Sequence, residues 1–151
     1  MQGSSMDKLV EETRKKALSL LNETENCAYS PFIALSEALG LELTEDAKAM
    51  PIGFAGGISG SRHICGALWA AVAAVSAYTS RNKGEGKTFA EIYMETHIKS
   101  AKVFRRFVRE FGSPNCGDLN PEFEWATEEQ RRKCSRIVAK AVEIALKTVY
   151  E

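Results

Sequence analysis

The stretch Ile64–Ala77, ICGALWAAVAAVSA, decides the fold, because its fourteen residues include no charge. Five alanines between Ala70 and Ala77 favour a helix here, since alanine is the strongest helix former. A helix that is apolar on every face lies buried at the centre of its domain. A helix that spans a membrane needs about 20 apolar residues, so this run predicts a core helix and no membrane span.

Amphipathic segments flank this core helix on both sides and predict the helices that cover it. Apolar residues recur in them at three- or four-residue intervals, which is the pattern of a helix with one buried face. Short polar side chains precede several segments and can accept hydrogen bonds from the first N–H groups of a helix. We predict helices over Asp7–Asn22, from the N-cap Asn26 to Leu39, from Thr44 to before Pro51, over Thr88–Phe111 and after Thr127.

These elements predict an all-α, single-domain helical bundle of about five to six helices. Residues 6–151 form the domain, and residues 1–5 are expected to be a flexible leader or an expression scar. The C-terminal half of the Thr88–Phe111 segment carries one apolar stripe at three- to four-residue spacing. The stripe consists of Val103, Phe104, Phe107, Val108 and Phe111.

The composition is that of an ordinary globular domain without a strong electrostatic field. Of 151 residues, 44% are hydrophobic and 26% charged, and twenty basic residues balance twenty acidic ones. A net charge of zero gives no general attraction to nucleic acid or anionic lipid. Residues 7–16 are rich in charge where a signal peptide would be apolar. We therefore expect a cytoplasmic protein whose cysteines are thiols.

Four cysteines are the strongest candidates for chemistry: Cys27, Cys65, Cys116 and Cys134. None belongs to a C-x-x-C pair, which excludes the usual zinc-finger and thioredoxin-like patterns. All four are predicted near helix ends, so they could meet at one pole of the bundle. A helix N-terminus stabilises a thiolate, the form that attacks disulfides and binds soft metals. The alternative is that the cysteines are inert and only fill the core.

A glycine-rich loop precedes the core helix, with four glycines among residues 53–60. It has neither the G-x-G-x-x-G spacing nor a following Gly-Lys-Ser/Thr, so it does not predict a phosphate site. We expect its backbone to pass close to a packed helix or to the Cys65 sulfur, with N–H groups available to a cofactor or sulfur at Gly56, Gly57 and Gly66. A tight connection without a ligand is the alternative.

Two histidines and a basic surface complete the candidates. His63 could be a ligand or a proton shuttle, although a histidine next to Arg62 is more typical of an exposed loop. Residue 94 is Met, so His97 lacks the Glu-x-x-His pattern of di-iron bundles. Basic residues between Lys99 and Arg109 predict a solvated face or a docking site for an acidic partner.

Several motifs together resemble the C_GCAxxG_C_C family of redox-active proteins over nearly the whole chain. They are Asn26-Cys27-Ala28, the loop Gly53–Ile58, Cys65-Gly66-Ala67, Phe111-Gly112-Ser113 with Cys116 and Leu119, and Cys134. The last glycine of the family's Cys-Gly-Ala-x-x-Gly element is Ala70 here. The resemblance implies a helical domain with four functional cysteines, and an iron–sulfur centre is associated with relatives joined to multihaem modules. This chain has no C-x-x-C-H and hence no covalent haem of its own.

Three hypotheses follow for the function. In the first, the four thiolates bind an iron–sulfur cluster or another soft metal. In the second, pairs of thiols cycle through disulfides and exchange electrons with an unknown redox partner protein. In the third, the chain is a non-catalytic helical interaction domain, homodimeric through its aromatic stripe, with structural cysteines.

Overall fold

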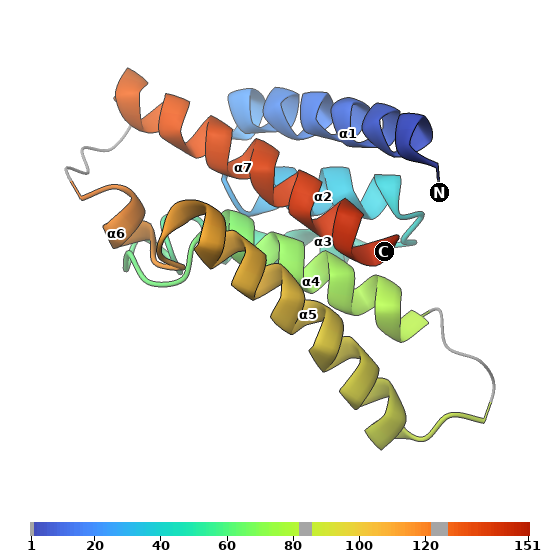
Figure 1. The fold of residues 1–151 in the computed structure, drawn as a ribbon. Helices are drawn as coiled ribbons and strands as arrows, with labels where there is room; N and C mark the ends of the chain where they lie inside the picture. The colour runs from blue at the N-terminus through green and yellow to red at the C-terminus, as the bar shows by residue number, and fades with distance from the viewer. Residues whose placement is uncertain (1, 82–85, 122–126) are drawn as a thin grey trace.

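The structure, a computed structural model, is a helical bundle (Figure 1) and describes residues 2–81, 86–121 and 127–151. Within these ranges it contains no strand, only an isolated bridge between Ile64 and Asn115. The all-α prediction is therefore confirmed. The elements are α1 (Gly3–Thr24), α2 (Tyr29–Ala38), α3 (Glu45–Ala49), a 3-10 helix η1 (Met50–Phe54), α4 (Gly66–Arg81), α5 (Phe89–Phe111), α6 (Cys116–Leu119) and α7 (Glu128–Val149).

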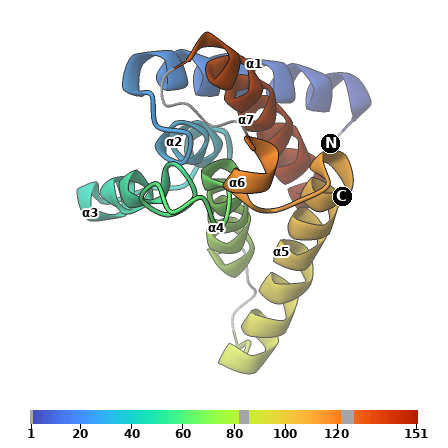
Figure 2. The same ribbon diagram turned by 90° about the vertical axis from the view of Figure 1, so that its left-hand side faces the viewer.

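The apolar helix α4 lies between α2, α5 and α7, and η1 also contacts it. Figures 1 and 2 show α1 on the far side of α2 and α7, away from α4. Buried alanines along α4, such as Ala67, Ala71 and Ala74, allow the neighbouring helices to approach closely. The predicted core helix is thus confirmed, and it begins at Gly66, directly after Cys65.

Side-chain caps begin the helices largely where the sequence predicts. Thr44 Oγ1 accepts a hydrogen bond from Ala47 N–H, and Thr127 Oγ1 accepts one from Gln130 N–H. Thr88 and Glu91 form a reciprocal capping box at the start of α5. Each cap satisfies backbone donors that the first turn leaves unpaired. Helix α1 differs from the prediction, because it already begins at Gly3 and includes part of the expected leader.

The apolar stripe of α5 is only partly buried. Val103 and Phe107 are fully buried in the core, whereas the Phe104 side chain is 40% exposed. The difference arises because Phe104 lies one helical step of about 100° from Val103 and so leaves the core-facing side. Figure 1 shows the N-terminal part of α5 extending away from the other helices. No described helix is long and apolar enough to cross a membrane.

Candidate cysteine centre

The four cysteines lie at or near the N-terminal ends of α2, α4, α6 and α7, and these helix ends all lie at the left-hand side of the bundle in Figure 1. Cys27 precedes α2, Cys65 precedes α4 and Cys116 is the first residue of α6. Cys134 lies within the first two turns of α7. All four are free thiols, of which Cys65 and Cys116 are buried and the other two are partly exposed. The fold therefore gathers cysteines that are far apart in the sequence.

A short antiparallel backbone contact joins the segment that holds Cys65 to the segment that holds Cys116. The Cys65 N–H donates to the Pro114 carbonyl at 2.8 Å, and the Cys116 N–H donates to the His63 carbonyl at 2.7 Å. These bonds flank the isolated bridge between Ile64 and Asn115. The start of α4 is thus fixed by main-chain bonds to the start of α6, a four-residue helix that sequence periodicity is too short to reveal.

The glycine loop does pass close to cysteines, but to Cys27 and Cys116 rather than to Cys65. A Cβ added at Gly57 would lie 2.8 Å from Cys116 Cβ, and the φ of Gly57 is +72°. A Cβ added at Gly66 would lie 3.1 Å from the Cys27 sulfur. Backbone N–H groups of Gly56 and Gly66 donate to that sulfur. The three predicted glycines therefore lie against the cysteines, two of them where a side chain would collide.

A cavity of about 290 Å³ opens beside the thiols. Cys27, Cys116 and Cys134 line it, together with Gly56 and residues of α1 and α7. Its walls are mixed, since Leu18 and Leu21 are apolar whereas Glu25 and Arg131 are charged. Arg131 also forms an ion pair with Glu25 at 3.1 Å. Three of the four sulfurs are therefore accessible from one hollow.

Burial raises the pKa of every one of the four thiols. It raises the pKa of Cys65 and Cys134 to about 12, and it also dominates for Cys27 and Cys116. The negative charge that Cys27 carries as a thiolate raises the pKa of each of the other three. The expected stabilisation of thiolates by helix N-termini is thus outweighed, because desolvation exceeds the effect of the N–H donors. At neutral pH the centre holds protonated thiols.

Two residues that sequence reasoning missed act on Cys116. The Asn120 side chain hydrogen-bonds the Cys116 thiol, and the charge of Arg62 acts on the same group; both lower its pKa against the effect of burial. Asn120 is only 4% exposed, and its Oδ1 has no hydrogen-bond partner in the part of the chain that the structure describes. Arg62 Nη2 donates to the Asn120 carbonyl at 2.7 Å. The arginine beside His63 was visible in the sequence, but its role depends on a fold that brings α6 next to it.

The remaining candidates lie outside this group. The His63 and His97 side chains are exposed, and the His97 ring stacks on Tyr93 with centroids 5.6 Å apart. Lys99 donates to the Thr148 carbonyl at 2.8 Å, so part of the predicted basic face holds α7. Across residues 2–81, 86–121 and 127–151, no three His, Cys, Asp or Glu side chains are arranged to hold a metal ion.

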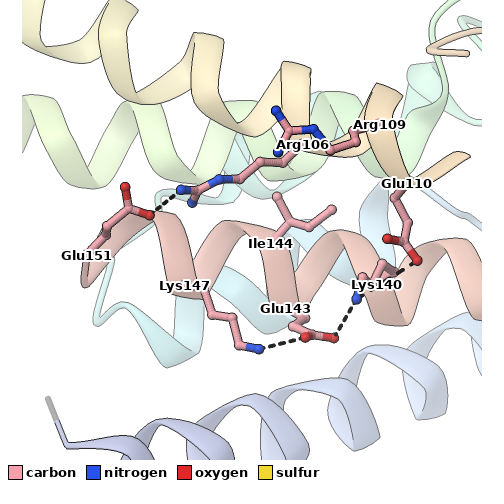
Figure 3. A pocket seen from close by; sticks show the side chains of 8 residues that line it. All are labelled: Arg106, Arg109, Glu110, Lys140, Glu143, Ile144, Lys147 and Glu151. Carbon is pink, nitrogen blue, oxygen red and sulfur yellow. Dashed lines mark hydrogen bonds and ion pairs between the residues drawn. The ribbon is translucent and has the colours of Figure 1, made fainter. Parts of the chain in front are cut away.

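A second hollow of about 400 Å³ lies between α5 and α7 (Figure 3) and is lined almost entirely by charged residues. Glu143 accepts from Lys147 at 2.8 Å and pairs with Lys140 at 3.5 Å. Burial would raise the pKa of Glu143, but these two lysines bring it below its usual value. Arg106 pairs with Glu151 across the same hollow. Acid and base are matched here, which is typical of a helix–helix contact.

All four cysteines lie within the part of the chain that matches a known protein family. Residues 25–148 match a family model described as "Putative redox-active protein (C_GCAxxG_C_C)". A protein of Archaeoglobus fulgidus, described only as uncharacterized, is 54% identical over 142 residues, which cover 92% of this chain and 94% of that protein. No solved structure matches the chain.

Proposed function

Because the chain belongs to the C_GCAxxG_C_C family, we propose that its four cysteines act together as one redox centre. The observation that carries the proposal is the geometry: Cys27, Cys116 and Cys134 line one cavity, and main-chain bonds around the Ile64–Asn115 bridge join the Cys65 segment to the Cys116 segment. The pKa effects agree with it, because a negative charge on Cys27 would raise the pKa of the other three thiols, and one on Cys116 would do the same for Cys65 and Cys134. Such mutual effects require neighbouring sulfurs, since charge interactions weaken with distance. Four separate core cysteines would not need this arrangement.

Cysteine thiolates are the ligands that an iron–sulfur cluster or another soft metal prefers, so Cys27, Cys65, Cys116 and Cys134 would hold such a group. Within the described residues these side chains are not arranged to hold a metal, so binding would have to draw them together. Burial, and after it the charges of neighbouring thiolates, raise the pKa of Cys65 and Cys134, and a bound cation would offset both effects. A cluster supplies one-electron transfer. The N–H groups of Gly56 and Gly66, which donate to the Cys27 sulfur, would stabilise electron density on that ligand.

Thiol–disulfide exchange is the second candidate, and the cavity favours it. Cys27, Cys116 and Cys134 line a hollow from which a partner's disulfide could be reached. Two of these thiols would become one disulfide, and the partner's disulfide would take up the two electrons and two protons to become two thiols. The raised pKa values make this exchange slow at neutral pH and faster in alkali.

The deciding experiment is the iron and acid-labile sulfide content of protein purified without oxygen, with four Cys→Ser variants. Ser135→Ala is the matched control, because Ser135 lines the same cavity without a thiol. A cluster predicts iron and sulfide in the wild type and in the control, and their loss in each cysteine variant. Disulfide chemistry predicts no metal but reversible loss of paired thiols on mild oxidation. Absence of both would contradict a redox centre and leave a structural role.

A further inference from the structure

Helix α5 exposes several large apolar side chains that no described element covers. Phe89 is 79% exposed, Ile98 is 50% exposed, and Tyr93, Met94 and Phe104 are also exposed. Phe89 and Tyr93 lie on the same side of the helix as the buried Phe107, where the N-terminal part of α5 extends away from the other helices, whereas Met94 and Ile98 lie on the opposite side. A run of large exposed apolar side chains along one helix is unusual for a monomer, and it marks a contact surface.

The spacing along one face of α5 matches a two-helix seam. Positions 90, 94, 97, 101, 104 and 108 alternate intervals of four and three residues, which is the a/d pattern of a coiled coil. Along the seam, Ala90, Met94, His97 and Phe104 are exposed, and Ala101 and Val108 are partly exposed. The seam continues for almost the whole helix, so it would suit another long helix.

Charge along α5 selects the orientation of that partner helix. Glu91 and Glu95 lie in the N-terminal half, whereas Lys102, Arg105 and Arg109 lie in the C-terminal half. Glu91, Ile98 and Arg105 flank the seam on the same side, seven residues apart. A second copy of α5 in antiparallel orientation places the acidic half of each helix beside the basic half of the other. A parallel copy would place like charges together.

We propose that two copies of this chain associate through antiparallel packing of their α5 helices, with the two-fold axis close to residue 99. In this register Met94 of each copy faces Phe104 of the other, and on the flank of the seam Glu91 of each copy approaches Arg105 of the other. Within the described residues, Arg105 has no ion-pair partner in its own chain. The net charge of zero removes any overall repulsion between copies. This dimer is independent of the chemistry at the cysteines.

The first test is the mass in solution by sedimentation equilibrium. We expect the wild type at twice 16.6 kDa and Ile98→Asp at 16.6 kDa, because one new carboxylate from each copy would meet the other on the flank of the seam, next to its centre, in place of an apolar contact. Ile52→Asp is the matched control, since Ile52 is 54% exposed but lies on η1, away from α5. It should remain dimeric. A monomeric wild type, or a dimeric Ile98→Asp, would overturn the proposal.

The second test concerns the antiparallel register. Arg105→Glu should raise the dimer dissociation constant by about tenfold, because each dimer then contains two facing pairs of like charge. The double variant Glu91→Lys, Arg105→Glu should recover most of that loss. Circular dichroism of each variant checks that α5 remains helical, because Glu91 also caps it. If the double variant dimerises no better than Arg105→Glu alone, this register is wrong.

Discussion

The cysteine end of the bundle and the charged hollow between α5 and α7 bury ionisable groups in opposite ways. At the cysteine end, four thiols are buried without a paired counter-charge, and burial raises their pKa. In the hollow, Glu143 is also partly buried, but Lys140 and Lys147 bring its pKa below the usual value. Burial with a counter-charge completes an ion pair, whereas burial without one leaves a group that gains from a cation or from oxidation. By this difference, the charged hollow stabilises the contact between α5 and α7, whereas the cysteine end is the candidate for chemistry.

The largest effect should come from crowding the cysteine end. Gly57→Ala places a Cβ 2.7 Å from the His63 carbonyl and 2.8 Å from Cys116 Cβ, at a positive φ. We expect a loss of about 2–4 kcal/mol in the free energy of unfolding, measured with urea.

Gly112→Ala is the control for this substitution. Gly112 has a φ of +85°, but nothing lies within 4 Å of an added Cβ. It should cost only about 1 kcal/mol, which is the strain of the backbone alone. Equal losses in the two variants would contradict close packing against Cys116.

The second effect is alkaline destabilisation by the thiols. The pKa of Cys134 is raised to about 12 in the folded protein, against about 8.5 in an unfolded chain. This preference for the protonated form stabilises the fold fully below the unfolded pKa, and it is lost as the pH rises through the folded pKa. At pH 10 the wild type should lose about 2 kcal/mol more than Cys134→Ser, each relative to pH 7.

Urea unfolding of both proteins under reducing, metal-free conditions measures that difference. Parallel curves of stability against pH for the two proteins would show that Cys134 has the same pKa in the folded and unfolded states. The contrast between the raised pKa of Cys134 and the lowered pKa of Glu143 would then be wrong.

A smaller effect on stability, with the opposite dependence on pH, is expected from the charged hollow. Glu143→Gln should cost about 1 kcal/mol at pH 7, because the variant loses its pairs with Lys140 and Lys147. The lowered pKa makes this contribution present above the unfolded value of about 4.3, and it is lost as the pH falls through the folded pKa. Thermal unfolding at pH 7 and pH 3 measures it. Glu12→Gln, in an exposed pair, should change stability little at either pH.

The smallest effect concerns the reactivity of the Cys116 thiol. Arg62→Gln removes the charge that opposes the raised pKa of this thiol. Alkylation of Cys116 at pH 8, followed by mass spectrometry, should slow by about two- to threefold, since a surface charge acts weakly through solvent. Arg131→Gln is the control, because Arg131 lines the same cavity but pairs with Glu25. Equal slowing by both variants would mean that the general field, not Arg62, acts on the thiol.

The sequence predicts the fold well, because the fold depends on local patterns; that the four cysteines form the site stays a prediction. The uncharged run at Ile64 predicts the core helix, and Thr88 and Thr127 predict the starts of α5 and α7 through a capping rule that needs only neighbouring residues. The resemblance adds that the four cysteines belong together. The 40% exposure of Phe104 could not be predicted, since a stripe of apolar residues does not reveal where the core ends and the surface begins.

The contacts within the site were beyond prediction, because they depend on long-range packing. Arg62 acts on Cys116 across more than fifty residues of sequence, and even Asn120, four residues after Cys116, reaches it only through α6, which is too short to predict from periodicity. The glycine loop was expected close to a packed helix or to the Cys65 sulfur, and the fold places Gly57 against Cys116 at the start of α6 and Gly56 beside Cys27. The sign of the thiol pKa shifts was also missed, since helix N-termini are visible in a sequence whereas desolvation is a property of the folded core.

The bridge between Ile64 and Asn115 has a consequence for the order of events during folding. It joins segments separated by all of α4 and α5, so its formation requires closure of a long loop, which is slow compared with helix formation. The helices should therefore form before Cys65 and Cys116 meet. In a refolding experiment, the far-ultraviolet helix signal should recover first, and these two thiols should become protected from alkylation last. Any chemistry at the four cysteines is then a property of the finished fold, acquired in its final step.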